Sequence, residues 1–334
     1  MHQLSETLPV LALPFLACLT IAALHAYMGL HVLRRGVVFV DIALAQWAAL
    51  GAAAALLLGP RLWPTELRAA GPPVAANEAA LAAELEAEAQ SGSAAAPLPA
   101  ETVVEAHPHA AAERRFQYAM SLGFALLGAV LLSVGRFREE VVPHEAVIGI
   151  LFVVAAALSV LVLSKAPHGH EKMEAMLIGS ILFVSRRALL KMAILYAALG
   201  ALHFALRRHF LAISENVEAA ERAGYHVRRW DTLFFASFAL MVTESVALAG
   251  VFVVFSYLII PAACARLFAQ SFRGQLFLAW AVALAITLLG LGVSAAADLP
   301  TGATLVAASG LAFLAAGLFR LVISAAVKQG AGER

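Results

Sequence analysis

The chain has 334 residues, of which 62% are hydrophobic and 13% are charged, and its mean hydropathy is +0.85. Soluble domains carry about 25% charged residues, so this much apolar surface indicates a protein whose solvent is lipid. The formal net charge of +1 gives no basic field for nucleic acid. The two cysteines, Cys18 and Cys264, both lie in apolar runs, which argues against a disulfide framework or a cysteine-based metal site.

Apolar runs that cross about 30 Å of hydrocarbon need about 20 residues. The first such run, residues 8–28, follows no basic segment, so we expect it to be retained rather than cleaved as a signal peptide. The run from Leu233 to Phe268 is too long for one crossing and is interrupted at Thr243-Glu244-Ser245 and at Gly250, which predicts two helices. Residues 176–185 are too short to cross and are typical of a half-helix. The other expected crossings are residues 37–58, 117–134, 144–164, 188–206, 275–296 and 303–323.

The sequence therefore predicts an all-α, polytopic membrane protein with eight or nine transmembrane helices in a single domain, residues 1–334. Arginine and lysine accumulate in cytoplasmic loops, and residues 207–231 hold five arginines. We therefore place this segment inside, together with the C-terminus, and the N-terminus outside. Arg186 and Arg187 are exceptions to the charge bias, because this orientation places them outside with Lys191.

Residues 59–116 form a long outer segment in this topology. The segment is rich in alanine, proline and glutamate. Residues 77–90 are compatible with a short acidic helix, and the composition predicts disorder for most of the remainder.

The segment from Glu218 to Gly224 reads EAAERAG and lies between two basic pairs in the cytoplasmic loop 207–231. We expect a short helix that ends at Gly224, since glycine readily adopts the left-handed turn that closes a helix. Ala219 and Ala220 would give this helix a small-residue face that fits close into the groove of a partner protein. An ordinary amphipathic helix at the membrane interface is the alternative.

Two acidic residues are expected inside the membrane, Asp41 and Glu244. A carboxylate in a transmembrane helix costs roughly 2.5–3.5 kcal/mol on insertion scales, so it usually faces a transport path or a partner charge. Glu244, near the outer side, is placed to meet an entering cation, or it is an acid in an interfacial loop. Asp41 is a second path residue, or it pairs with Arg34 or Arg35 at the inner face.

Further polar residues are candidates for the same path. His25, in the first crossing, is either a path residue or a hydrogen-bonded packing residue. Gln46 offers an amide oxygen, which is a weak ligand for zinc and suits a harder ion better. Two histidine pairs in outer loops suit divalent metals and predict a weak metal-gathering vestibule, with solvated polar loops as the alternative. These pairs are His107 with His109, and His168 with His170.

The order of these signals resembles the membrane permeases of zinc- and manganese-type ABC importers. The likeness covers nearly the whole chain apart from residues 59–116. The stretches that carry it are 29–41 (GLHVLRR and VFVD), 148–152 (IGILF), 177–182 (LIGSIL), 218–224 (EAAERAG), 250–263 (GVF and LIIPAA) and 299–303 (LPTGA).

The resemblance implies a transport subunit of a bacterial inner membrane that catalyses no reaction and carries no resident cofactor. Two copies would form the pore, and two ATPase subunits would bind at Glu218, Ala219, Ala220 and Gly224 of the coupling loops. An extracytoplasmic metal-binding protein would deliver the cargo, a divalent metal ion, with zinc first and manganese or iron next. The chain contains no Gly-Lys dipeptide and so no Walker A loop, which agrees with ATP hydrolysis in a separate subunit.

The chain departs from the family pattern in two places. The family's second helix carries Asp-Ala-Leu-Ser-His, whereas here Gln46 replaces the histidine and the acid lies one residue earlier, at Asp41. One residue rotates a side chain by about 100° around a helix, so the usual metal relay is altered. Glu215-Asn216-Val217 replaces Phe-Asp-Pro before the coupling helix, which predicts a weaker or different cap.

Two other transport functions fit the same sequence. A permease for siderophores or cobalamin would share the dimeric architecture but would have a wider and less ionic path. An ion-coupled secondary transporter would use Asp41 and Glu244 as ion ligands and would need no ATPase.

Overall fold

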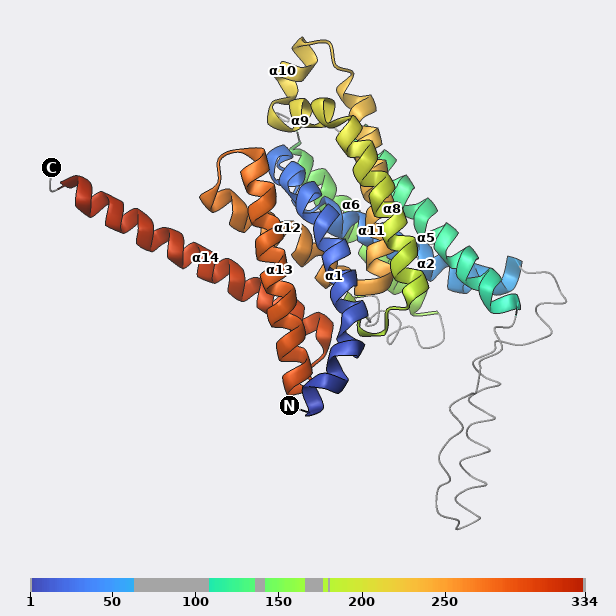
Figure 1. Ribbon diagram of the computed structural model, residues 1–334. Coiled ribbons are helices and arrows are strands. Elements are labelled where there is room, and N and C mark those ends of the chain that lie inside the picture. Colours follow the sequence, from blue (N-terminus) through green and yellow to red (C-terminus); the bar gives the residue numbers. More distant parts are fainter. Residues whose placement is uncertain (1, 63–107, 136–141, 166–176, 180, 333–334) are drawn as a thin grey trace.

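The computed structural model describes residues 2–62, 108–135, 142–165, 177–179 and 181–332. Every regular element within these ranges is a helix, which confirms the all-α prediction (Figure 1). The elements are α1 (His2–Arg35), α2 (Val40–Leu62), α5 (Pro108–Val134), α6 (His144–Leu163), η1 (Ile181–Phe183), α8 (Arg186–Ala205), α9 (Arg207–Glu215), α10 (Val217–Arg222), α11 (Val227–Ala249), α12 (Val251–Phe268), α13 (Phe272–Ala297) and α14 (Thr301–Gly332).

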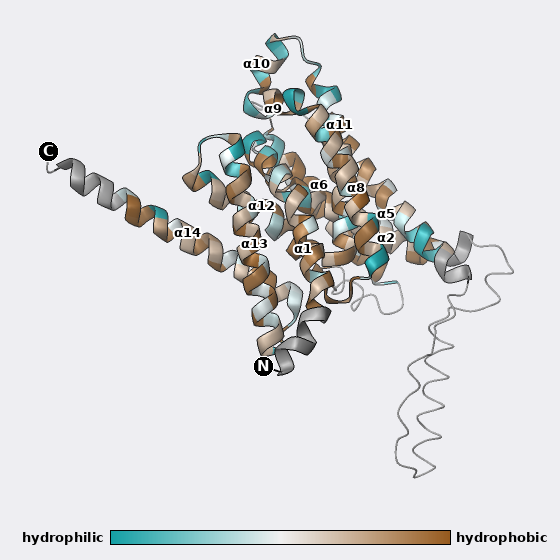
Figure 2. Ribbon diagram, in the orientation of Figure 1, coloured by the Kyte–Doolittle hydropathy of each residue, from teal (hydrophilic) through white to brown (hydrophobic). Residues whose placement is uncertain are grey.

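Nine of the described helices are long and apolar enough to cross a membrane. They coincide with the nine segments expected from the sequence, so the upper of the two predicted counts is confirmed. Figure 2 shows the corresponding pattern, in which apolar residues dominate the spanning helices and polar residues gather around α9 and α10.

Several expected boundaries were wrong. Helix α1 continues through Arg35, so residues 29–35 are helical and the chain turns only at Gly36, where φ is +66°. Helices α2 and α5 extend into both ends of the segment 59–116, while residues 63–107 lie outside the described residues. In the expected half-helix 176–185, Leu177 and Ile178 are helical. Gly179 comes next with φ +71°, and the short helix η1 begins at Ile181.

The break in the long run 233–268 lies at Gly250 alone. Thr243, Glu244 and Ser245 are ordinary residues of α11, contrary to the expectation that they interrupt the helix. Gly250 has φ +79° and ψ 161°, a conformation that essentially only glycine adopts. Its backbone also packs directly against Ile178 and Gly179, where a Cβ atom would overlap main-chain atoms. The break therefore joins α11, α12 and the segment before η1 at one end of the bundle.

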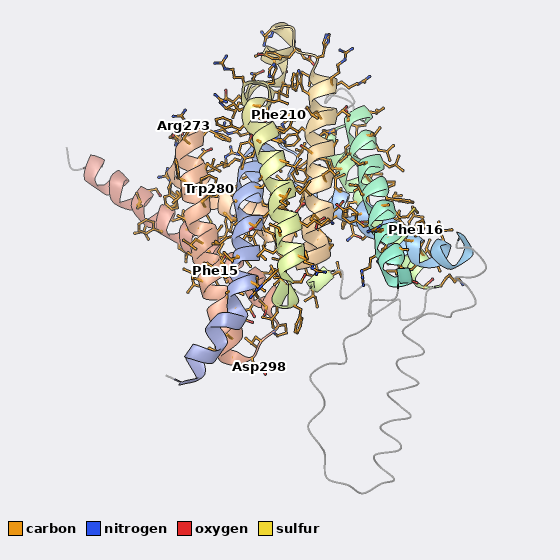
Figure 3. The ribbon with its side chains drawn as sticks, turned by 45° about the vertical axis from the view of Figure 1, so that its right-hand side comes forward. Phe15, Phe116, Phe210, Arg273, Trp280 and Asp298 are labelled. Carbon is orange, nitrogen blue, oxygen red and sulfur yellow. The ribbon has the colours of Figure 1, made fainter. Side chains whose placement is uncertain are left out.

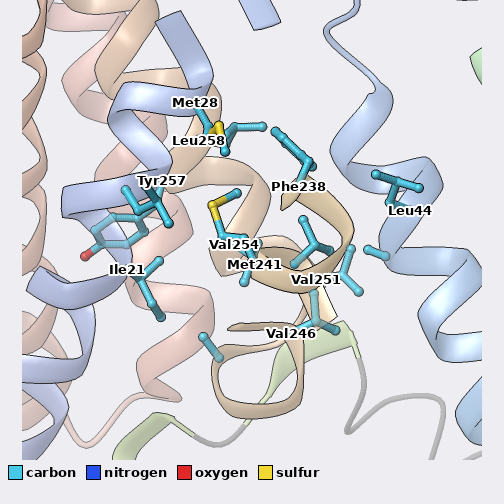
Figure 4. Packing of buried hydrophobic residues seen from close by; sticks show 14 of the residues in the cluster. Ile21, Met28, Leu44, Phe238, Met241, Val246, Val251, Val254, Tyr257 and Leu258 are labelled. Atoms are coloured by element: carbon cyan, nitrogen blue, oxygen red, sulfur yellow. The ribbon is translucent and has the colours of Figure 1, made fainter. Parts of the chain in front are cut away.

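The interior of the bundle is built around α2, α11 and α12. Helix α2 packs against α5 and α6, α11 packs against α5 and α2, and α12 packs against α1, α13 and α14. Figure 4 shows buried side chains at the centre of this packing, among them Leu44, Phe238, Met241 and Val254. Close approach of backbones assists it, because a Cβ on Gly51 would overlap the main chain of α5.

The two ends of the bundle differ in character. Helices α9 and α10 project from the end opposite the N-terminus (Figure 1), as the predicted orientation with the coupling segment inside requires. Helix α14 begins near the N-terminal end and slants away from the other helices, and only 6% of its spanning window is buried within this chain. Its exposed apolar side chains suit contact with lipid.

Candidate functional site

The first candidate site is the expected coupling segment, which comprises α9 and α10. The Asn216 side chain caps α10, since its oxygen accepts a hydrogen bond from the Ala219 N–H at 2.8 Å. At the other end, Gly224 N–H donates to Glu221 O at 2.9 Å and Tyr225 N–H donates to Ala220 O at 3.0 Å, while Gly224 has φ +85°. These two bonds form a Schellman motif, which satisfies the last carbonyls of the helix. The departure from Phe-Asp-Pro therefore leaves α10 with a side-chain cap of another type.

The exposed face of α10 differs in one respect from the expected docking face. Glu218 is 86% exposed at its side chain, and Ala219 and Gly224 are also exposed. Ala220, however, is 3% exposed and packs inward against Ile213 of α9 and Val227 of α11. Ala220 thus holds α10 on the protein, and the surface open to a partner contains Glu218, Ala219 and Gly224.

A buried ionic group fixes this segment to the spanning helices. Arg35 at the end of α1 donates to Asp231 Oδ1 of α11 at 2.6 Å and to Ser214 Oγ of α9 at 2.8 Å. The side chains of Arg35 and Asp231 are only 5% and 3% exposed. His31 Nδ1 lies 2.8 Å from the same Ser214 hydroxyl, so α1, α9 and α11 meet at one serine. Arg34 adds an exposed bond to Glu215 at 3.4 Å.

Aromatic rings fill the space beneath α9. Phe210 of α9 stacks on His203 of α8 with ring centroids 4.4 Å apart, and His209 stacks on Trp230 at 4.1 Å. Figure 3 shows Phe210 near the end that carries α9 and α10, with Asp298 at the opposite end. The coupling segment is therefore seated on α8 and α11 by packing as well as by charge.

The second site is a set of polar residues inside the bundle, beginning with Asp41. Asp41 lies in the first turn of α2 and is 1% exposed, and its Oδ1 has no hydrogen-bond partner among the residues that the structure describes. The expected pairing with Arg34 or Arg35 is wrong, because these arginines bond to residues of α9, α11 and α13 instead. Asp41 is thus a buried acid with one oxygen unsatisfied by the described part of the protein.

Gln46 and His25 do not lie where they could bind one ion together with Asp41. Gln46 is half-buried and lies five residues after Asp41, which separates the two side chains by about 140° around α2. His25 is fully buried, with Nδ1 2.9 Å from Ile21 O and Nε2 3.4 Å from Ser245 Oγ. This arrangement matches the packing alternative for His25.

Glu244 is a buried acid within α11, so the alternative of an interfacial loop acid is wrong. Its side chain is 6% exposed, and Oε2 lies 2.8 Å from Nζ of Lys191 in α8. The Lys191 ammonium also lies 3.9 Å from the centre of the Tyr118 ring in α5. Lys191 was counted with the outer basic residues although it lies near the start of the expected crossing 188–206, and it lies in the second turn of α8; sequence reasoning missed it as a site residue. A single lysine in the apolar run Ala-Leu-Leu-Lys-Met-Ala-Ile-Leu was the available signal.

Helices α8 and α11 are joined by polar contacts at three depths, which we call the α8–α11 ladder. The first contact is the pair Lys191–Glu244. In the second, the Tyr196 hydroxyl donates to Met241 O at 3.2 Å. In the third, His203 Nε2 lies 2.8 Å from Ser237 Oγ. The ladder ends beneath the coupling segment, where His203 contacts Phe210.

The side chains of the remaining histidine candidates lie outside the described residues. His107, His168 and His170 lie outside the described residues, and His109 lies in α5 with a side chain that is also outside them. Among the described residues, no group of three or more histidine, cysteine, aspartate or glutamate side chains converges on a point where a metal ion could be held.

Comparison with known proteins gives a consistent result. A family model with the description "ABC 3 transport family" matches residues 114–320. A Chlamydia muridarum protein named "Probable metal transport system membrane protein" is 24% identical over 192 residues, 57% of this chain and 66% of the relative. A Haemophilus influenzae protein named "Probable iron transport system membrane protein" is 27% identical over 176 residues, 52% of this chain and 65% of the relative. The chain thus spans just under two thirds of the length of these relatives.

A solved structure extends the likeness over the whole fold. The structure of PsaBC from Streptococcus pneumoniae in complex with Fab matches with a TM-score of 0.67 and 17% identity, and the match covers 94% of both chains. Likeness at this identity concerns the arrangement of the helices.

Proposed function

Because the chain belongs to the ABC 3 transport family, we propose that it is the membrane subunit of an ATP-driven importer for a divalent metal ion. The observation that carries the proposal is the capped and exposed helix α10, which lies within the family match and continues from α9. Arg35 joins α9 to the spanning helices, since it bonds to Ser214 of α9 and to Asp231 of α11. Such an element suits the transfer of motion from a docked ATPase to the bundle. The expected transport subunit without ATPase activity agrees with this family.

The partners of the subunit follow from this proposal. A separate ATPase subunit would dock on Glu218, Ala219 and Gly224, a second copy of the chain would complete the pore, and an extracytoplasmic metal-binding protein would supply the ion. ATP binding and hydrolysis would change the distance between the two coupling segments, and the helices would rock between inward-open and outward-open states.

The chemistry of the proposed path favours hard metal ions. Asp41 and Glu244 offer carboxylate oxygens, Gln46 replaces a histidine, and Nδ1 of His25 is engaged with the backbone. Carboxylate ligands suit manganese better than zinc, which prefers imidazole or thiolate ligands. We therefore place manganese ahead of zinc as cargo, with iron(II) as the alternative, in contrast to the order that the resemblance implies.

The test is the metal content of cells. Zinc, manganese and iron would be measured by mass spectrometry in deletion cells that carry wild-type chain, Gly224→Val or Gly224→Asn. Valine does not tolerate φ +85°, whereas asparagine enters the left-handed region with little strain, so only the valine variant should lose uptake. Membrane levels of the three proteins would be matched by immunoblot.

The outcomes separate the candidate functions. Selective loss of one metal, restored by wild type and Gly224→Asn only, supports the proposal. No change in any of the metals contradicts it and directs attention to siderophores or cobalamin. Uptake that follows an ion gradient and needs no ATPase indicates a secondary transporter.

A further inference from the structure

The pair between Lys191 and Glu244 is asymmetric. Glu244 is held in the core of the bundle with 6% of its side chain exposed, whereas Lys191 is 57% exposed on the outside of α8. The carboxylate is therefore the fixed partner and the ammonium the mobile one. Lysine carries its charge on a flexible four-carbon stem, and such stems extend readily from a spanning helix toward the membrane interface.

Lys191, Glu244 and Tyr118 lie on three helices, α8, α11 and α5, at a similar depth near the outer end of the bundle. Lys191 lies five residues after Arg186, where α8 begins, and Glu244 lies five residues before Ala249, where α11 ends. Each distance corresponds to about 7.5 Å along a helix. Tyr118 lies six residues after Ala112, the start of the α5 span, or about 9 Å along that helix. The pair thus lies near the outer end of the bundle, the end from which an imported ion would come.

We infer that Lys191 is a displaceable internal cation that occupies the Glu244 carboxylate until a divalent metal ion replaces it. This inference rests on the proposed function and deepens it by naming a residue that sets cargo charge. A monovalent ion offers the carboxylate the same charge as the ammonium, so exchange gains nothing in Coulomb attraction. A divalent ion at the same distance has twice the Coulomb attraction that the ammonium has.

Tyr118 supports this role for Lys191. Its ring holds the ammonium at 3.9 Å through a cation–π contact, which keeps Lys191 over the entrance without burying it. A partner of this kind can release the ammonium more easily than a second buried carboxylate could. The remaining contacts of the α8–α11 ladder, at Tyr196 and His203, do not depend on Lys191.

The direct test is the reactivity of Lys191 toward an amine-acylating reagent in the purified full-length protein, measured by peptide mass spectrometry. Manganese chloride should raise the acylation rate of Lys191 several-fold, while sodium chloride at equal ionic strength should not. In Glu244→Gln the rate should already be high and should not respond to manganese. Lys165, which is exposed at the end of α6, is the internal reference.

Two results of this experiment would overturn the inference. In the first, the acylation rate of Lys191 rises in Glu244→Gln but does not change with divalent ions in wild type, which would mean that Lys191 only neutralises a buried acid. Equal rates in wild type and Glu244→Gln would mean that the pair does not protect the amine.

Uptake by variants gives an independent readout that also separates this inference from the proposed function. If Lys191 only neutralises Glu244, the double variant K191M/E244Q should regain the uptake lost in K191M, and that result would reject the inference. If Glu244 is a ligand, the double variant stays inactive. Failure of wild type itself to take up any metal would reject the proposed function, whatever the acylation data show.

Discussion

The buried pair of Arg35 and Asp231 allows the sharpest prediction about coupling. Nη1 of Arg35 lies 2.6 Å from Oδ1 of Asp231, and both side chains are almost fully buried. At an effective dielectric constant of about 20, the gross Coulomb attraction is roughly 6 kcal/mol, and the desolvation of both ions offsets much of it. Removal of one partner from a buried ion pair typically costs about 3–5 kcal/mol. Asp231→Leu should therefore lower the free energy of unfolding by about this amount.

The pair should also behave as a unit. Arg35→Met and Asp231→Leu each remove one charge, so we expect the double variant to be less destabilised than the sum of the two single variants. Equilibrium unfolding of the purified protein in detergent would give the three free energies. The matched control is Glu215→Gln, because Glu215 is 64% exposed and its pair with Arg34 is 3.4 Å long, so its loss should cost less than 1 kcal/mol.

Transport measurements distinguish a coupling role from a purely structural one. In the proposed complex with its ATPase subunit, the double variant should hydrolyse ATP but move fewer metal ions per ATP, because α1 and α11 lose their common anchor to α9. Strict additivity of the single variants would refute the energetic argument. An unchanged ratio of transported metal to ATP in a stable double variant would refute the mechanical one.

Two further predictions concern the path and its outer end. Gly250→Val should lower the free energy of unfolding by about 1–3 kcal/mol in equilibrium unfolding, because valine cannot adopt φ +79° and would overlap Ile178 and Gly179. The control Gly200→Ala, where an added Cβ meets no atom within 4 Å, should be neutral or slightly stabilising in the same assay. Asp41→Asn should abolish metal uptake yet change the free energy of unfolding by less than about 1 kcal/mol, since the amide has the same size as a buried acid whose Oδ1 has no partner among the described residues; a larger loss of stability would instead show that Asp41 has a structural role.

The sequence predicted the crossings well because their signal is local. Length and hydropathy alone located the nine spanning helices. Asn216 and Gly224 flank α10, so its ends lie within a few residues of the expected limits. The predicted ends of α1 and α2 were less accurate. Hydropathy marks only the part of a helix that lies in the hydrocarbon, and both helices continue beyond that part. Thr243, Glu244 and Ser245 were misread as a break because polar residues in a spanning helix can be satisfied by partners on other helices.

Those partners are what the sequence could not supply. Asp231 lies 196 residues from Arg35, and Glu244 lies 53 residues from Lys191. Nothing local to Arg35 distinguishes Asp231 from the nearer Asp41, which is why the expected pairing was wrong. Ser214 and His31 carry no signal at all as isolated residues, and they acquire a role only where α1, α9 and α11 meet.

The two candidate sites are connected through a single helix. Asp231 and Glu244 lie 13 residues apart in α11, or about 20 Å along its axis, so the anchor of the coupling segment and the outer carboxylate belong to one rigid rod. The α8–α11 ladder holds α8 to this rod at Tyr196 and His203 as well as at Lys191. Displacement of Lys191 would consequently open only the outer contact and expose Glu244 while the inner contacts persist. An ion at the entrance and an ATPase at the coupling segment would then act on the same helix from its two ends.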